Sequence, residues 1–327
     1  MTYATGSFNT RVEMGKKLAE LFRTVGVTVK REYESTVNSE PAYTVIIQLA
    51  SDVFMRYTVQ WYKWYDTRYT DYYTDTLWSK MGSAYVEGAD DVSGIVSPTL
   101  GYGSGSASGS SHPLFPLPGI LHVARNVATS EIMFCLENPA DQNAACHGVG
   151  KMQIQDDTFG YSEQWFFDGD YAYRDVNSRA NIPFMYNVDG TGRAKAQSGS
   201  MQIRNNAGVV VSYHYLGTRS KSYNPDVWST FQPLGHEGAY NSIWNKLTFE
   251  PSLTSVFLPS IWLAHDALKT SLRTPRGERN SFRICNMLYL GTAQEIVYNS
   301  KKWRIFPCRG KPGTNTPGIA FLVGDAT

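Results

Sequence analysis

The feature that most constrains the fold is a series of short segments rich in β-branched and aromatic residues, separated by turn residues instead of long helices. Clear segments of this kind cover residues 27–33, 43–49, 53–65, 283–290 and 303–306. Side chains alternate between the two faces of a strand, so these runs favour strands. Strands that follow one another across short turns form antiparallel sheets. The sequence therefore predicts a mainly β protein, an antiparallel sandwich or barrel, and disfavours a parallel α/β enzyme fold.

One amphipathic helix is predicted near the start of the chain. Thr10 and Glu13 have the spacing of a capping box, and Gly26 is a natural stop. The residues between them place one apolar face at helical spacing, made of Met14, Leu18, Leu21, Phe22 and Val25. A second helix is expected over residues 260–272, on a stripe of Ile261, His265, Leu268 and Leu272. We thus expect a short N-terminal helix and one or two minor helices.

Turn residues punctuate the rest of the chain. Asp168 and Gly169 predict the turn of a hairpin over residues 161–176. Further turns are predicted at Asp189-Gly190, at residues 206–208 and at residues 299–301. Strands are also expected over residues 209–211, 295–298 and 319–323.

A change of composition suggests a division of the chain. Residues 93–119 are rich in Gly, Ser and Pro and carry little apolar surface, which is typical of a mobile loop or linker. The prediction is an N-terminal part over residues 1–92, this linker, and a larger β-rich domain over residues 120–327, with a single domain left open.

Low charge and many aromatic residues favour a protein that contacts neighbours. Charged residues make up 18% of the chain, below the roughly 25% of an ordinary soluble domain. The aromatic run from Trp61 to Tyr73 could stack bases or sugars, but Asp66, Asp71 and Asp75 offset its basic residues. Core and interface packing is the preferred interpretation.

The charge distribution bears on possible partners. The formal net charge is +1, which gives no overall attraction to nucleic acid or an anionic membrane. Residues 269–311 are nevertheless basic and residues 134–190 acidic, so these stretches are either solvated surfaces or complementary patches that meet between subunits or face DNA.

Residues 1–10 lack the features of a secretory leader, and no membrane span is predicted. The four cysteines lack CxxC spacing and are interpreted as buried thiols in a reducing cytoplasm.

Motifs for metal binding are weak. No HExxH array occurs among the six histidines, His112, His122, His147, His214, His236 and His265. The nearest approach to a metal site is Cys146-His147, with Asp156 and Asp157 further along. A calcium loop at Asp168, Asp170 and Asp175 lacks the glycine and final glutamate of an EF-hand.

Catalytic motifs are equally weak. Glu163 beside Trp165 and Asp170 beside Tyr171 would suit a glycosidase only at a carboxylate separation that sequence does not reveal. A phosphate loop at residues 101–105 has no helix pattern after it, and a nucleophilic Cys135 or Cys308 has no local histidine partner. We therefore predict that the chain is not an enzyme and has no catalytic, cofactor-binding or metal-binding residues.

The C-terminal segments Tyr289–Tyr298, Lys302–Pro307 and Gly318–Leu322 resemble the closing strands of virion structural proteins from tailed bacteriophages. Those proteins often combine a short N-terminal helix with aromatic-rich strands, as here. The resemblance implies a component of the tail, neck or baseplate, present in many copies, synthesised in the host bacterial cytoplasm and located in the virion. Its partners would be further copies of itself and other virion proteins, with possible proximity to DNA and no membrane.

Two other functions stay open from the sequence. A carbohydrate-binding or glycan-cleaving module of a viral fibre would display tryptophan and tyrosine as a sugar platform. A metal-dependent hydrolase would use Cys146, His147 and nearby acids. The preferred hypothesis is a structural subunit that acts through subunit contacts.

Overall fold

A computed structural model describes a large part of the chain, and the statements below refer to that part. It covers residues 1–64, 72–97, 100–103, 117–140, 144–151, 153–154, 165–169, 199–205, 207–216, 228–231, 258–265, 273–286, 290–307 and 317–326. The fold is mainly β, with three antiparallel sheets and, within the described residues, one helix, which confirms the predicted fold class.

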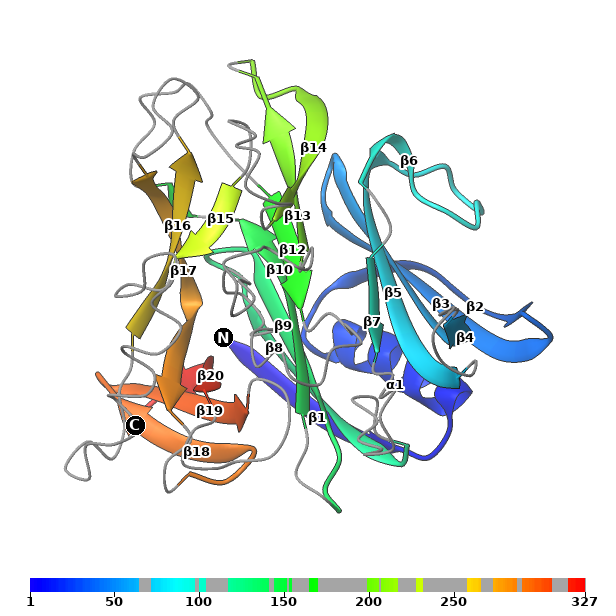
Figure 1. The fold of residues 1–327 in the computed structure, drawn as a ribbon, viewed down its shortest axis with the longest axis horizontal. Coiled ribbons are helices and arrows are strands. Elements are labelled where there is room, and N and C mark those ends of the chain that lie inside the picture. Colours follow the sequence, from blue (N-terminus) through cyan, green and yellow to red (C-terminus); the bar gives the residue numbers. More distant parts are fainter. Residues whose placement is uncertain are drawn as a thin grey trace.

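Sheet A forms the middle of the molecule (Figure 1). It has seven strands in the order β1-β8-β9-β10-β12-β13-β14. Their bounds are Thr2–Phe8, Gly119–Asn126, Glu131–Glu137, Ala144–Lys151, Trp165–Gly169, Gly199–Arg204 and Val210–Leu216. The first strand was not predicted, because the segment around Gly6 has no regular apolar alternation.

Sheet B contains six strands from the N-terminal part of the chain. Five follow in sequence order from β2 to β6, and β7 also pairs with β5. Their bounds are Thr28–Val37, Glu40–Ala50, Val53–Trp64, Tyr72–Ala84, Ser93–Val96 and Leu100–Gly103. The strands predicted over residues 27–33, 43–49 and 53–65 correspond to β2, β3 and β4.

Sheet C comes mostly from the C-terminal part. Its strands run in the order β15-β16-β17-β20-β19-β18, and β11 pairs with β17. Their bounds are Gln153–Ile154 for β11, then Trp228–Phe231, Leu258–His265, Arg273–Asn286, Gln294–Tyr298, Lys301–Pro307 and Pro317–Asp325 for β15 to β20. The strands predicted over residues 295–298, 303–306 and 319–323 and the turn before Lys301 are confirmed. Strand β17 confirms residues 283–286 of the strand predicted over 283–290, and residues 287–289 lie outside the described residues.

Helix α1, Arg11–Thr24, begins and ends where the sequence predicts. The Thr10 hydroxyl accepts a hydrogen bond from the Glu13 amide at 3.2 Å, while the Glu13 carboxylate accepts one from the Asn9 amide at 2.8 Å. Gly26 adopts a left-handed φ of 80°, and the Val27 amide donates to the Phe22 carbonyl at 2.8 Å. This closes the carbonyl end of the helix in the manner that favours glycine.

The sheets and the helix form stacked layers. All five apolar residues predicted for the helix face are buried, in a core shared with sheets A and B. A second apolar cluster joins the other face of sheet A to sheet C, through Met133 and Ala144 on one side and Phe306, Ile319 and Phe321 on the other. Sheet A therefore lies between sheet C and the helix, and sheet B covers the helix (Figure 1).

The division into two domains is not reflected in this arrangement. Strand β1 lies beside β8 in one sheet, with Thr2 opposite Arg125. The core around α1 includes both Val45 of β3 and Phe134 of β9. Residues before 92 and after 120 thus share one sheet and one core.

Part of the predicted linker is ordered in sheet B. Strands β6 and β7 both pair with β5, and residues 104–116 lie outside the described residues. Gly94 has a φ of 75°, and a Cβ there would overlap the Ser83 hydroxyl. This glycine allows a close approach between strands, so glycine content alone did not indicate mobility in residues 93–96 and 100–103.

Two local predictions were wrong. Residues 258–265 form strand β16, where a helix was expected over residues 260–272, because pairing with β15 and β17 prevails over the helical spacing of Ile261 and His265. Asp168 and Gly169 end strand β12, between β10 and β13, and do not form a turn. The second arm of that hairpin and the turn at residues 189–190 lie outside the described residues.

Candidate functional site

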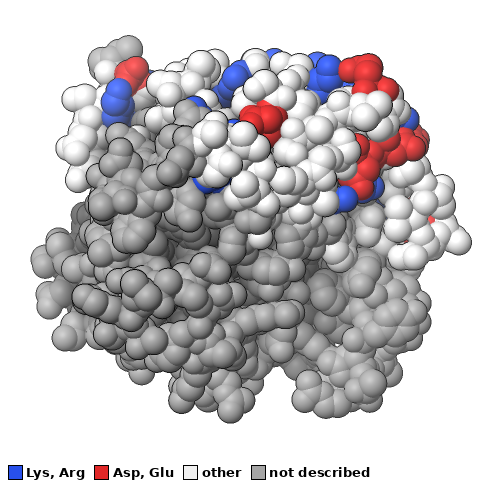
Figure 2. All heavy atoms as spheres, turned by 90° about the horizontal axis from the view of Figure 1, so that it is seen from above, with Lys and Arg blue, Asp and Glu red and all other residues white. Residues whose placement is uncertain are grey.

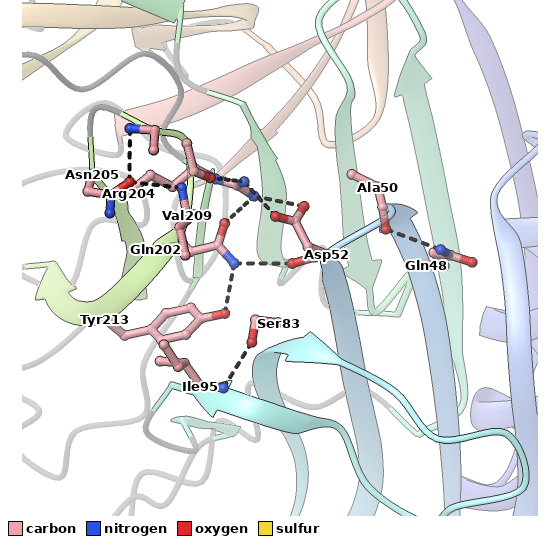
Figure 3. A network of polar contacts seen from close by, with 12 residues as sticks. Gln48, Ala50, Asp52, Ser83, Ile95, Gln202, Arg204, Asn205, Val209 and Tyr213 are labelled. Atoms are coloured by element: carbon pink, nitrogen blue, oxygen red, sulfur yellow. Dashed lines mark hydrogen bonds and ion pairs between the residues drawn. The ribbon is translucent and has the colours of Figure 1, made fainter.

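Three groups of polar side chains lie at or beside the contacts between sheets in the described residues. The first group joins sheets A and B (Figure 3). Asp52, in the turn between β3 and β4, receives two hydrogen bonds from Arg204 at the end of β13, at 2.6 and 3.0 Å. The same guanidinium donates to the Gln202 side-chain oxygen at 2.7 Å and to the Gly208 carbonyl at 2.9 Å.

Within this group Arg204 is shielded from solvent, whereas Asp52 is partly exposed. The Arg204 side chain is 8% exposed and that of Asp52 39%. Gln202 completes the contact by donating to the Asp52 carbonyl at 3.3 Å and to the Tyr213 hydroxyl at 3.0 Å. Burial raises the pKa of Tyr213 to about 12, so its hydroxyl stays protonated. We call these four residues the A–B clasp.

A second group lies on the face of sheet A that meets sheet C. His122 on β8 has its Nδ1 atom 2.6 Å from the Tyr3 hydroxyl and its Nε2 atom 2.7 Å from the Glu137 carboxylate. Burial is the main cause that raises the pKa of Tyr3, so its hydroxyl stays protonated. Tyr3, His122 and Glu137 thus form one chain of hydrogen bonds with the imidazole in the middle, and we call this chain the Tyr3–His122–Glu137 relay.

Side chains of sheet C cover Tyr3 and His122. The Arg304 guanidinium lies over the Tyr3 ring, 4.8 Å from its centroid, and the Phe306 ring lies 4.9 Å from that of His122. His122 is 5% exposed. A carboxylate, an imidazole and a phenol in series can move a proton in an open active site. Here they are covered by sheet C, and their hydrogen bonds fix the strands β1, β8 and β9 to one another.

A third contact joins sheets A and C through a buried carboxylate. Glu131 on β9 accepts hydrogen bonds from the Ser281 amide at 3.0 Å, from the Ser281 hydroxyl, and from the Thr129 hydroxyl at 2.8 Å. Asn126 donates to the same Ser281 hydroxyl at 2.9 Å. The β8–β9 hairpin is therefore attached to strand β17 by polar contacts.

The structure separates Cys146 and His147, the pair considered as the nearest approach to a metal site. On β10, Cys146 faces the apolar cluster shared with sheet C. The ring of His147 points to the other face of the sheet, where it stacks on Phe134 with centroids 4.9 Å apart. Burial lowers the pKa of His147 to about 3. In the described part of the chain no group of three His, Cys, Asp or Glu side chains is placed to hold a metal ion, and Asp156 and Asp157 lie outside it.

The remaining sequence candidates are not brought together in the described residues. Trp165, expected beside a catalytic Glu163, is buried in the core around α1. Cys135, considered as a nucleophile, lies beside Cys146 in the cluster shared with sheet C. The other candidates for calcium binding, glycan cleavage and thiol chemistry lie outside the described residues, namely Glu163, Asp170, Tyr171, Asp175 and Cys308.

The aromatic run is partly covered. Tyr57 is buried against Phe22 and Phe134, and Trp61 is half-buried. Among tyrosine and tryptophan side chains that the structure describes, Tyr298 is the one classed as exposed, at 40%. Within the run from Trp61 to Tyr73, Trp61 is the one aromatic side chain that the structure describes, so the packing interpretation of the other rings stays a prediction.

Sequence reasoning missed all three polar contacts. Asp52 and Arg204 are separated by 152 positions, and Glu131 and Ser281 by 150. No spacing rule connects residues that far apart. The local signal was limited to the turn after Arg204, whose Gly208 has a φ of 75° and follows an Asn205 side chain that accepts from the Val209 amide.

No protein-family model matches the chain, and no curated protein matches its sequence significantly. None of the helical segments in the described residues is long and apolar enough to cross a membrane.

Proposed function

We propose that the chain is a structural subunit of a larger particle, a component of a phage tail, neck or baseplate that acts through subunit contacts. The observation that carries this proposal is the use of the buried polar groups. The A–B clasp, the Tyr3–His122–Glu137 relay and the Glu131–Ser281 contact all fix strands and sheets to one another. Polar groups used to hold the layers together support a structural role.

Exposed apolar side chains add support. Val209 and Val211 lie at the start of β14, and Ile95 and Val96 lie on β6, the neighbouring edge of sheet B. These four side chains are between 38% and 58% exposed. Apolar groups that share one region of a surface are typical of protein contacts.

The mixture of acidic and basic side chains on the surface also supports a protein that contacts other subunits. Figure 2 shows acidic and basic side chains close together on the described part of one face. Ion pairs at sheet B include Lys30 with Glu87 at 2.9 Å and Arg31 with Asp90 at 2.6 Å. Such mixed charge gives register to a protein contact and little general affinity for nucleic acid.

Native mass spectrometry over a range of protein concentrations tests the proposal. A structural subunit should give discrete oligomers whose population rises with concentration, visible as rings or stacks by electron microscopy. A strictly monomeric chain at high concentration would contradict it. A monomer that binds on a glycan array would instead favour the module of a viral fibre.

A pair of variants locates the contact. Val209→Lys with Val211→Lys should lower the oligomer population at least tenfold, because charge on β14 would have to be desolvated. Val127→Lys, at an equally exposed valine in the β8–β9 turn, is the matched control and should leave the population unchanged. Equal populations for both variants would place the contact elsewhere on the surface.

A further inference from the structure

Two thiols face each other inside the contact between sheets A and C. Cys135 on β9 and Cys146 on β10 are directly opposite in the antiparallel register. The Cys146 thiol donates to the Cys135 sulfur, and the two sulfur atoms are 3.3 Å apart. Both side chains are 0% exposed, and both are thiols in this structure.

The backbone already has the geometry of a disulfide. Opposite residues of an antiparallel pair have Cα atoms about 4.5 to 5.5 Å apart. Disulfides span Cα separations of about 4.4 to 6.8 Å, with sulfur atoms about 2.05 Å apart. The two sulfur atoms therefore need to approach by about 1.3 Å, which side-chain rotation supplies without a change of register.

We propose that Cys135 and Cys146 are an oxidisable pair that forms a cross-strand disulfide in the centre of sheet A. With hydrogen peroxide as oxidant, one sulfur attacks a peroxide oxygen, which gives a sulfenic acid and one water molecule. The second thiol then attacks that sulfur, the S–S bond forms, and the hydroxyl leaves as a second water molecule. The protein loses two hydrogen atoms, and the peroxide is reduced.

The third described cysteine is not part of the pair. Cys285 belongs to a separate cluster with Trp303, Ile305 and Ala320. Burial is the main cause that raises the pKa of its thiol, and the neighbouring Cys146 adds to it. The pair is defined instead by the contact between the Cys135 and Cys146 sulfur atoms and by the opposite places of the two residues in the register.

The rate at which the two thiols are oxidised should report how often sheet C separates from sheet A. Phe306, Ile319 and Phe321 from sheet C cover the two thiols. An oxidant reaches them when these rings move away from sheet A. The rate of disulfide formation should therefore rise several-fold in sub-denaturing urea, which increases the population of such open states.

Tryptic mapping of the full chain tests the proposal directly. Neither lysine nor arginine occurs between Arg125 and Lys151, so one peptide, residues 126–151, holds both cysteines and no other. After treatment with peroxide, this peptide should be lighter by two hydrogen atoms and resist alkylation. Cleavage after Glu137 should then leave two fragments linked until a reductant is added.

Thermal unfolding gives the second readout. The closed loop between the two cysteines restricts the unfolded chain, so oxidation should raise the melting temperature by about 5 °C. Cys146→Ser should show neither this rise nor the mass loss, while Cys308→Ser should show both. Separate sulfinic acids in the peptide, or a link from it to Cys285 or Cys308 in the folded protein, would overturn the proposal, and the wild-type peptide map decides this even where a serine variant fails to fold.

Discussion

The imidazole of His147 shows how burial decides the protonation of a single residue. Its ring stacks on Phe134 in the core, and its pKa falls from 6.5 to about 3 because the charged form would be desolvated. Between these two pH values the unfolded chain binds a proton that the folded chain does not. His147 therefore makes no contribution to the pH dependence above pH 6.5 and lowers stability progressively as the pH falls below it.

We expect His147→Phe to remove this acid sensitivity. The phenyl ring can keep the stacking on Phe134, whereas the wild type should lose up to about 1.4 kcal/mol per pH unit on account of His147. Urea unfolding of both proteins at pH 7.5, 5.5 and 4.5 measures the difference in slope. Parallel pH profiles for the two proteins would show that His147 titrates normally in the fold.

At Gly15 the packing of one residue opposes its helix propensity. Gly15 lies inside α1, and a Cβ at this position would overlap the side chain of Tyr43 on β3. We expect Gly15→Ala to destabilise the protein by about 1 to 3 kcal/mol, even though alanine is favoured by about 1 kcal/mol in an isolated helix. Lys16→Ala, at an exposed neighbour, serves as the control in denaturant unfolding and should be near neutral. A stabilised Gly15→Ala variant would mean that Tyr43 and β3 shift to make room for the added methyl group.

At the scale of elements, two hairpins depend on the same unusual turn. Asn38 and Ser39 connect β2 to β3, and Asn299 and Ser300 connect β18 to β19, all four with φ between 51° and 64°. Two consecutive left-handed residues define the type I′ turn, which matches the twist of the strands. Serine is poorly suited to its second position, where glycine is preferred.

Ser39→Gly should accordingly stabilise the protein by about 0.5 to 1 kcal/mol, because glycine adopts a left-handed φ without steric cost. Ser35→Gly, inside strand β2, is the matched control and should destabilise by a similar amount. Chemical denaturation compares the two variants. The same sign of change for both would rule out the turn as the cause.

Elements were predictable where local chemistry agrees with the tertiary contacts. The capping residues Thr10 and Glu13 define the start of α1 without help from the rest of the fold. The β-branched and aromatic residues of β2 and β3 were an equally clear signal. Strand β16 was not, because the spacing of Ile261 and His265 fits both periods and only the flanking strands decide. The glycines of residues 93–103 were ambiguous because glycine occurs both in mobile loops and where strands approach closely, and only the pairing with β5 decides.

At the scale of the whole molecule, the contacts between sheets were beyond sequence reasoning. Cys135 and Cys146 are near in sequence, yet neither their pairing nor the separation of Cys146 from His147 follows from spacing until the register is known. The A–B clasp requires β13 to end beside the β3–β4 turn, which depends on the order of all the strands in sheet A. The candidate sites arise from topology, and single-sequence patterns do not specify topology.

Removing one member of the clasp should weaken the attachment of sheet B to sheet A. Asp52→Ala leaves the enclosed Arg204 guanidinium without its carboxylate, and we expect a loss of about 2 kcal/mol, less than for a fully buried pair because Asp52 is partly solvated. Glu34→Ala removes a pair with Lys16 in which both side chains are more than half exposed, and it should cost about 0.5 kcal/mol or less. Urea unfolding separates the two cases, and equal losses would show that the clasp contributes no more than a surface pair.

The pairing of β1 with β8 has a consequence for synthesis on the ribosome. Thr2 lies opposite Arg125, so the first strand emerges long before its partner has been translated. At about 5 to 20 residues per second, the nascent chain carries an unpaired strand for several seconds or longer. The helix that follows can form at once, while sheet A has to wait until β8 has been translated.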